Sequence, residues 1–138
     1  MSNENKAIAK RWFDEVWNNG NASAIKELLA EDVLIHGLID STGAPVKGVK
    51  GFETFHAQFR GAFPNIMITV EDMIAEGDKV AVRCNVKAKH SGDSLGISAT
   101  HNDVEFTGIA ILRVHNGQLA EGWNNFDFLE MNRQLGIV

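Results

Sequence analysis

The sequence predicts a single α+β domain, with helices in the first half of the chain and strands in the second. Apolar residues recur at helical spacing up to about Ala62, and the period changes to two after Pro64. No low-complexity linker or internal repeat divides the chain, and its 138 residues fit one domain, residues 1–138. Helices followed by a run of strands are typical of the α+β class.

The first expected helix covers residues 3–18. The run NNGN at residues 18–21 ends it, because glycine tolerates the left-handed conformation that is common after a helix. Its apolar residues fall on one stripe at helical spacing: Ile8, Trp12, Phe13, Val16 and Trp17.

A shorter helix is expected over residues 22–30, and a short strand over 32–36. The third helix is expected over 48–62 and is closed by Pro64. Four of its residues share one face at positions i, i+3, i+4 and i+7: Phe52, Phe55, His56 and Phe59.

After Pro64 the sequence predicts a meander of antiparallel strands and a short helical tail. Asn116-Gly117 is a strong signal for a hairpin turn between the last two strands. Because one sheet face must be covered by the helices, a strongly curved sheet leaves a cavity, which is a common form of small-molecule site. The expected strands are 66–75, 79–90, 104–115 and 118–128, and the tail is 129–135.

Composition and charge exclude several classes of function. The net charge is -5 and the basic residues are scattered, so no surface for nucleic acid is expected. No stretch approaches the roughly 20 apolar residues that cross a bilayer, and the polar start MSNENKAIAK lacks a signal-peptide core, so we expect no membrane partner and a cytoplasmic protein. Cys84 is the only cysteine, which excludes an intrachain disulfide.

The last strand carries the best candidate for a catalytic group. Glu121, Trp123, Asn125 and Asp127 share a face by the period of two. A carboxyl group beside aromatic rings is partly desolvated, which raises its pKa and suits it to proton transfer near neutral pH. The alternative is that Asp127 caps the following helix, since aspartate is a favoured N-cap residue.

Arg83 and Asn85 share one face of the strand at 79–90. Inside a pocket, Arg83 would pair with a carboxylate such as Asp127 or bind an oxygen-rich substrate. The alternative places this face in solvent, as Lys87 and Lys89 on the same face indicate. Cys84, on the opposite face of the same strand, is expected in the core.

The turn at Asn116-Gly117 leaves two registers open for the hairpin. A two-residue turn pairs His115 with Gln118 and puts Phe106, Ala110 and Leu112 on the side of Asp127. A bulge at Gly117 pairs Val114 with Gln118 instead. The residues on the side of Asp127 are then Ile109, Ile111 and Arg113.

The five histidines do not form a metal motif. No HExxH and no close pair of histidines is present, so we expect no metal ion. Phosphate loops, nucleophile elbows and dinucleotide fingerprints are also absent from the sequence. His36, which lies between an apolar strand and Gly37, is the histidine expected to face a cavity.

The motifs in this order resemble the SnoaL-like polyketide cyclase (ester cyclase) family, within the nuclear transport factor 2-like superfamily. The similar segments span almost the whole chain. They are WFDEVWNNGNASAIKELLAEDVLIHG, GFETFHAQFRGAFPN, MIAEGDKVAVR, KHSGDSLGISATHNDVEFTGIAILRVHNGQLAEGWNNFD and the terminal QLG. The chain departs from the family at AKHSG and at His101, near the loop expected over the pocket mouth, which affects the expected substrate more than the fold.

The resemblance implies a cone-shaped, curved antiparallel sheet packed on three N-terminal helices and enclosing a pocket. Family members are usually dimeric or larger, and a homodimer is expected here. The resemblance further implies an acid/base enzyme without cofactor that closes a ring by intramolecular aldol condensation. Asp127 in EGWNNFD matches the family's general acid/base, and Arg83 and His36 are the other expected catalytic residues. The expected substrate is a small hydrophobic carbonyl compound, bound by Trp17, Phe55, Phe59, Asn85, His90, Arg113 and Trp123.

Two other functions fit the same fold. Limonene epoxide hydrolases of the superfamily use an Asp-Arg-Asp constellation, which Arg83, Asn85 and Asp127 match incompletely because an amide replaces one carboxylate. A non-catalytic module that binds a small molecule is the other alternative, since one fold hosts many functions.

Overall fold

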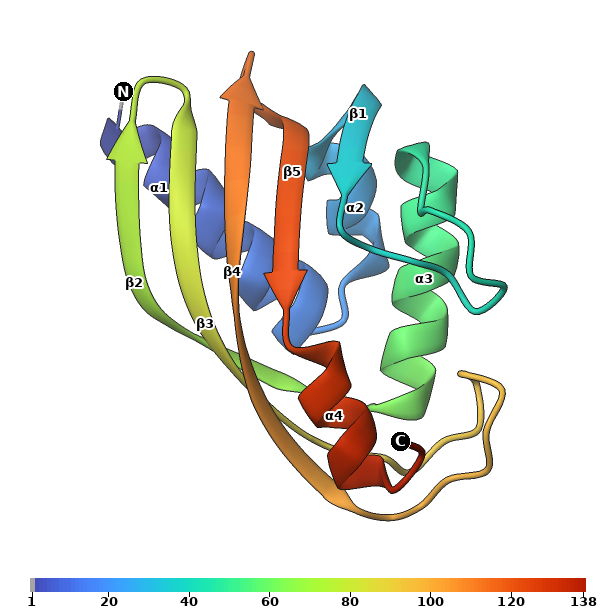
Figure 1. Cartoon of the computed structure of the whole chain (residues 1–138). Helices are drawn as coiled ribbons and strands as arrows, with labels where there is room; N and C mark the ends of the chain where they lie inside the picture. The colour runs from blue at the N-terminus through green and yellow to red at the C-terminus, as the bar shows by residue number, and fades with distance from the viewer. Residues whose placement is uncertain (1) are drawn as a thin grey trace.

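The computed structural model, which describes residues 2–138, is a curved five-stranded sheet with helices packed on its inner face (Figure 1). The chain begins with helices α1 (Ser2–Arg11) and α2 (Ala22–Leu28), joined through a π-helical segment, η1 (Trp12–Asn18). The elements that follow are β1 (Leu29–His36), α3 (Gly48–Ala62), β2 (Met67–Glu76), β3 (Lys79–Lys89), β4 (Asp103–His115), β5 (Gln118–Phe126) and α4 (Phe128–Leu135).

The α+β class and the order of elements predicted from the sequence are confirmed. The helix expected over residues 48–62 has these bounds in the structure, and the expected strands agree with β2 to β5 within two residues at each end. No helix within residues 2–138 is long and apolar enough to span a membrane.

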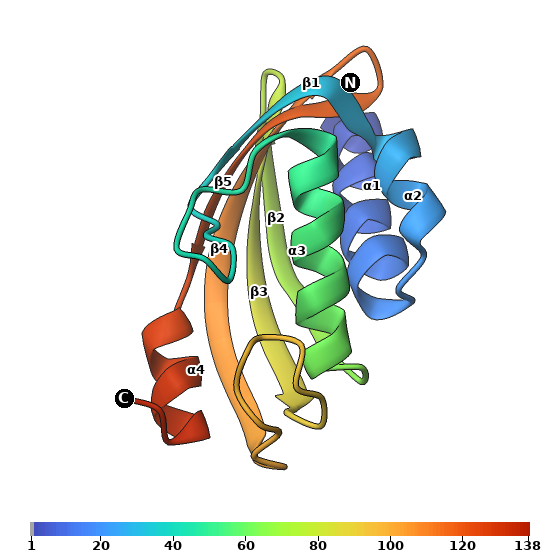
Figure 2. The same ribbon diagram turned by 90° about the vertical axis from the view of Figure 1, so that its right-hand side faces the viewer.

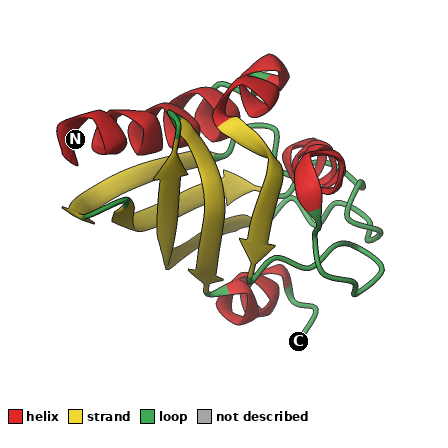
Figure 3. Ribbon diagram, turned by 90° about the horizontal axis from the view of Figure 1, so that it is seen from above, coloured by secondary structure: helices red, strands yellow, loops and turns green. Residues whose placement is uncertain are grey.

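The sheet is mixed rather than purely antiparallel. Its strand order is β1-β5-β4-β3-β2, and β1 runs parallel to β5 while all other neighbours are antiparallel. The sheet is not closed, since β1 and β2 form its two edges. Figure 2 shows α1, α2 and α3 on the inner face, with α4 set apart from them at the lower end of the sheet. Seen from above, the strands curve between these two groups of helices (Figure 3).

The inner face of the sheet forms the core with the helices. Every second residue of β3, from Val80 to Ala88, is buried against them, as the alternation predicts. The matching residues of β4, from Val104 to Val114, continue this layer, and each strand pair keeps the alternation in register. The other residues of β3 and β4 form an outer face that α1, α2 and α3 leave uncovered, and α4 packs at the end of β4 that holds Glu105.

A β-bulge in β5 decides which of its side chains face inward. His115 pairs with Gln118, so Asn116-Gly117 forms the two-residue turn. Val114 then pairs with Leu119 but Arg113 with Glu121, which leaves Ala120 as an extra residue. The turn therefore has two residues, as in the first register expected from the sequence. Because of the bulge, however, Ile109, Ile111 and Arg113 lie beside Asn125, Trp123 and Glu121, as in the second expected register.

Candidate functional site

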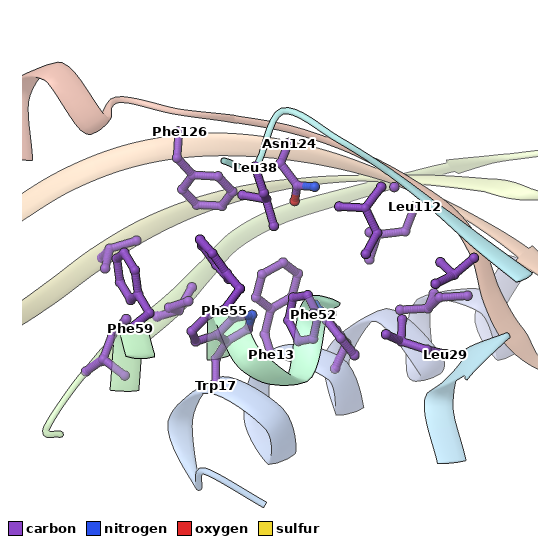
Figure 4. A pocket seen from close by; sticks show the side chains of 18 of the residues that line it. Phe13, Trp17, Leu29, Leu38, Phe52, Phe55, Phe59, Leu112, Asn124 and Phe126 are labelled. Atoms are coloured by element: carbon purple, nitrogen blue, oxygen red, sulfur yellow. The ribbon is translucent and has the colours of Figure 1, made fainter. Parts of the chain in front are cut away.

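A cavity lies between the inner face of the sheet and the helices η1 and α3 (Figure 4). It has about 750 Å³ of empty space, including the part that opens to solvent. Its wall is mostly aliphatic and aromatic, and the only lining side chains that carry an oxygen atom are those of Glu121 and Asn124. The helices contribute seven aromatic rings to it: Trp12, Phe13, Trp17, Phe52, Phe55, Phe59 and Phe128.

Three of the residues expected to bind substrate lie in this wall, and their binding role stays a prediction. Trp17, Phe55 and Phe59 all line the cavity, and the Trp17 ring packs edge-on against both phenylalanines at centroid distances of 6.2 and 5.8 Å. Phe55 and Phe59 stack on each other at 5.7 Å. Offset and edge-on contacts of this kind are favourable for aromatic pairs, so the aromatic wall is held in a fixed arrangement.

The π-helical segment η1 brings several aromatic side chains to the cavity at once. Trp12, Phe13, Val16 and Trp17 are all buried within seven residues. A π-helical turn places one more residue inside each hydrogen-bonded ring than an α-helix does, and such turns are frequent at functional sites. The sequence predicted an ordinary helix here, because the stripe of apolar residues does not distinguish an α-helix from a π-helix.

Helix α3 holds the end of η1 in place. His56 Nε2 donates to the carbonyl oxygen of Val16 at 2.7 Å, and Arg60 donates to the carbonyl oxygen of Trp17 at 2.6 Å. Burial lowers the pKa of His56, with a weaker opposing effect from its bond to Val16 and a further lowering by Arg60. A neutral His56 therefore fixes the position of η1 against α3.

Asn124 is the polar group that sequence reasoning missed. Its side-chain Nδ2 donates to the carbonyl oxygen of His36 at 3.0 Å, and its amide lies among apolar side chains of the cavity (Figure 4). Gly37, with a φ of +84°, allows this contact, because a Cβ atom there would overlap the carbonyl oxygen of Asn124. The pair Asn124-Asn125 was visible in the sequence, but the period of two could not say which amide faces inward.

Three of the expected site residues form a cluster on the outer face instead. Glu121 contributes to the cavity wall, but its carboxylate binds His36 Nε2 at 2.7 Å and Arg113 Nε at 3.2 Å. Trp123 stacks on the His36 ring at 5.5 Å, and Lys79 lies over Trp123 at 6.0 Å. The hydrogen bond from His36, followed by that from Arg113, lowers the pKa of Glu121. His36, Arg113 and Trp123 therefore do not line the cavity.

Arg83 and Asn85 also lie on the outer face. Arg83 Nε binds Asp72 Oδ2 on the neighbouring strand at 2.6 Å, and this carboxylate raises the pKa of the guanidinium group. Asn85 donates to Glu105 at 3.1 Å. Neither contacts Asp127, so the structure does not assemble the constellation of an epoxide hydrolase from these residues. The positions of Arg83 and Asn85 agree with the alternative from the sequence, in which this face of β3 lies in solvent and not in a pocket.

Asp127 caps helix α4. Its Oδ1 accepts a hydrogen bond from the backbone N–H of Glu130 at 3.0 Å, and its side chain is exposed. Its neighbours Phe126 and Phe128 line the cavity, but Asp127 itself does not. The structure thus shows the capping arrangement, and the acid/base role of Asp127 stays a prediction.

His90 lies beneath the loop at 91–102, outside the cavity wall. Its ring is fully buried, its Nδ1 accepts from the N–H of Thr100 at 3.0 Å, and its Nε2 has no partner among residues 2–138. Cys84 is in the core as expected, and burial raises the pKa of its thiol to about 12. Within residues 2–138, no group of three or more His, Cys, Asp or Glu side chains is placed to hold a metal ion.

Comparison with known protein families gives a match over most of the chain. The family model described as SnoaL-like polyketide cyclase matches residues 7–135. No curated protein sequence matches the chain.

Solved structures of similar fold cover nearly the whole chain. A proposed polyketide cyclase from Bacillus cereus is 29% identical, with a TM-score of 0.82 over 98% of this chain and 82% of that one. IdmH, a proposed polyketide cyclase from Streptomyces antibioticus, is 28% identical, with a TM-score of 0.80 over 96% of this chain and 98% of that one. AclR, a proposed hydroxylase from Streptomyces galilaeus, is 24% identical and shares the fold, with a TM-score of 0.86 over 100% of this chain and 84% of that one.

Proposed function

Because the chain belongs to the SnoaL-like polyketide cyclase family, we propose that it binds a small, largely apolar carbonyl compound and closes a ring in it by intramolecular aldol addition. The observation that carries this proposal is the aromatic cavity between η1, α3 and the sheet, with one inward-facing amide. Aldol addition is redox-neutral, so the reaction consumes no cofactor. The expected substrate fits the composition of the wall, which would bury apolar rings.

The cavity's main contribution would be orientation of the substrate. A flexible carbonyl compound loses conformational freedom when it closes a ring, and holding it folded lowers the barrier by several kcal/mol in favourable cases. The stacked rings of Phe55 and Phe59 on one side and the sheet residues Leu112 and Phe126 on the other offer two flat surfaces for this. The rings are mutually packed, so the shape of the cavity is largely formed before the substrate enters.

Asp127 is the proposed acid/base group of the chemical step. The carboxylate takes a proton from a carbon between two carbonyl groups, and the resulting enolate carbon bonds to the carbon of a third, more distant carbonyl group of the same molecule. The carbonyl π bond opens to an alkoxide, which recovers the proton from Asp127. One carboxylate oxygen caps α4, which leaves the other free for proton transfer, and the flanking Phe126 and Phe128 connect Asp127 to the cavity.

A second candidate function is binding of the same kind of compound without catalysis. The capping bond and the exposure of Asp127 favour it, because both features explain an aspartate at this position without any chemistry. The cavity serves either function equally well.

The substitution Asp127→Asn separates the two candidates. Asparagine caps a helix as well as aspartate does, so folding is preserved while the acid/base group is lost. With linear aryl triketones that can close a six-membered ring, we expect the substitution to reduce turnover at least about 100-fold and to leave binding unchanged. Equal turnover by both proteins would remove Asp127 from the mechanism, and binding without turnover by either would establish the second candidate.

We further propose that the outer face of the sheet joins two copies of the chain. An apolar row crosses four strands there, because Ile74 pairs with Ala81, Ala81 with Ile111, and Ile111 with Trp123. Ile74 is 70% exposed, and contiguous exposed apolar surface of this kind marks association sites. Charged pairs of both signs flank the row, Asp72–Arg83 on one side and Arg113–Glu121 on the other, which suits a two-fold interface in which each patch meets its own copy.

Sedimentation measurements test this interface. We expect a dimer for the wild type and a monomer for Ile111→Asp, with the fold unchanged because Ile111 does not reach the core. A wild type that sediments as a monomer at about 100 μM would contradict the proposal.

A further inference from the structure

Of the two oxygen-bearing side chains that line the cavity, Glu121 is engaged by His36 and Arg113, while the amide oxygen of Asn124 is not engaged. Asn124 Nδ2 donates to the carbonyl oxygen of His36 at 3.0 Å. A carbonyl oxygen can only accept, so the amide nitrogen must lie on that side and Oδ1 on the other. Figure 4 shows the Asn124 amide beside Leu38, with its oxygen directed toward the rings of Phe13 and Phe52 across the cavity.

The backbone of Asn124 is held from two directions, and the bond to the carbonyl oxygen of His36 then orients its side chain. Its own strand fixes the backbone, since Asn124 pairs with Ala110 in the middle of the sheet. The turn after β1 crosses directly over it, which requires Gly37 at a φ of +84° because a Cβ atom would overlap the Asn124 carbonyl oxygen. The amide is therefore positioned before any ligand binds.

Within residues 2–138 the Asn124 side chain makes one hydrogen bond, through its nitrogen, and no protein donor reaches Oδ1. The side chains around it are apolar, among them Leu38, Leu112 and Phe126. Asn124 is half-buried, so water can reach Oδ1 in the empty cavity. A ligand that displaces this water costs free energy unless it supplies a donor in its place. A ligand that fills the cavity with apolar rings alone would leave Oδ1 without a partner.

We propose that Asn124 selects ligands that carry a hydroxyl group on a flat aromatic or enolic ring, with the hydroxyl hydrogen bonded to Oδ1. The proposal rests on the binding function proposed above and names the chemical class of its ligand. The ring lies against the aromatic wall of α3, and the hydroxyl group reaches β5. Ring closure of a polycarbonyl compound followed by enolisation gives a hydroxyl group of this kind.

Three naphthalenes of similar shape test the proposal in direct binding measurements by calorimetry. 2-Naphthol donates a hydrogen bond, 2-methoxynaphthalene only accepts one, and 2-methylnaphthalene does neither. We expect the wild type to bind 2-naphthol about tenfold more tightly than the other two, which corresponds to one hydrogen bond in a partly buried site. Equal affinities, or no binding of 2-naphthol, would overturn the proposal without recourse to any variant.

The substitution Asn124→Leu supplies the second arm. It keeps the volume and removes the acceptor, so the preference for 2-naphthol is expected to vanish while 2-methylnaphthalene still binds. The matched control is Asn125→Leu, which changes the neighbouring amide on the exposed outer face and should keep the tenfold preference. A preference that survives in Asn124→Leu would show that another group selects the hydroxyl. Because binding is measured, failure of the aldol activity leaves this result unaffected.

Discussion

The two faces of the sheet use the same strands and differ in what covers them. On the inner face, Val82 and Ala110 are fully buried against helices, and the cavity opens beside them. On the outer face, Ile74, Ile109 and Ile111 are exposed between ion pairs. Both faces are rich in apolar residues, so hydrophobic character alone does not mark the side that holds the site. The side is set by which face the helices cover.

The sharpest test of this comparison is a charge placed on each face in turn. Val82→Asp buries an unpaired carboxylate at a position with 0% exposure and is expected to cost on the order of 4 kcal/mol of unfolding free energy or more. Ile74→Asp, on the outer face of β2, is expected to change the unfolding free energy by about 0.5 kcal/mol or less at concentrations where the chain is a monomer. Urea unfolding of both variants checks the contrast, and similar losses would show that the outer face is also covered.

The crossing of Gly37 over Asn124 predicts the next largest effect. Gly37→Ala strains a positive φ and also drives a Cβ atom into the Asn124 carbonyl oxygen, so we expect a loss of about 2–4 kcal/mol. Gly43 has nearly the same φ, +86°, with no atom near its Cβ position. Gly43→Ala should therefore lose only the unfolding free energy that comes from backbone strain at positive φ, about 1–2 kcal/mol. Thermal or urea unfolding measures both, and equal losses would mean that the crossing is not tight.

The cap of α4 is expected to contribute less. Asp127→Ala removes the acceptor of the Glu130 N–H bond and should destabilise the protein by about 1 kcal/mol. Asp127→Asn keeps an acceptor at the same position and should leave the unfolding free energy within a few tenths of the wild-type value. A large loss in Asp127→Asn would instead point to a charge-dependent contact of the carboxylate.

The smallest effect concerns pH and the outer cluster. The folded-state pKa of Glu121 is lowered, first by the hydrogen bond from His36 and then by Arg113, so the ionised carboxylate stabilises the folded state. This contribution is fully present above the unfolded-state pKa, about 4.3, and is lost as the pH falls through the lower folded-state value.

The stability difference between wild type and Glu121→Gln should therefore shrink as the pH is lowered from 7 toward 3. Asp32→Asn, on the exposed side of β1 and without an ion-pair partner among residues 2–138, serves as the control and should show no such trend. Urea midpoints at each pH measure both, and a difference that persists at pH 3 would contradict the assignment.

Much of the fold could be predicted from the sequence because local periodicity reports it directly. The stripe at 48–62 and the alternation at 79–90 gave α3 and β3 almost to the residue. The parallel pairing of β1 with β5 could not be predicted in this way. It joins residues about 90 positions apart, as in the pair His36–Trp123, and no local pattern encodes such a contact.

The side chains of β5 that face the cavity were harder to predict, because both faces of this strand carry similar residues. The residues Trp123 and Asn125 on one side and Asn124 and Phe126 on the other offer an aromatic ring and an amide to either face. The shared face of Glu121, Trp123 and Asn125 was predicted correctly, but it is the outer one. Trp17, Phe55 and Phe59 do line the cavity, because they lie on helices with only one apolar side.

The extra residue Ala120 shifts the inward and outward alternation of β5 by one position. Every side chain after it, from Glu121 to Phe126, points to the face opposite to the one that an unbroken ladder from the hairpin would give. A chain that lost this one residue would exchange Asn124 for its neighbours in the cavity wall without changing any of their identities. Insertions and deletions at the bulge are thus a route by which relatives with the same fold can acquire different ligand preferences.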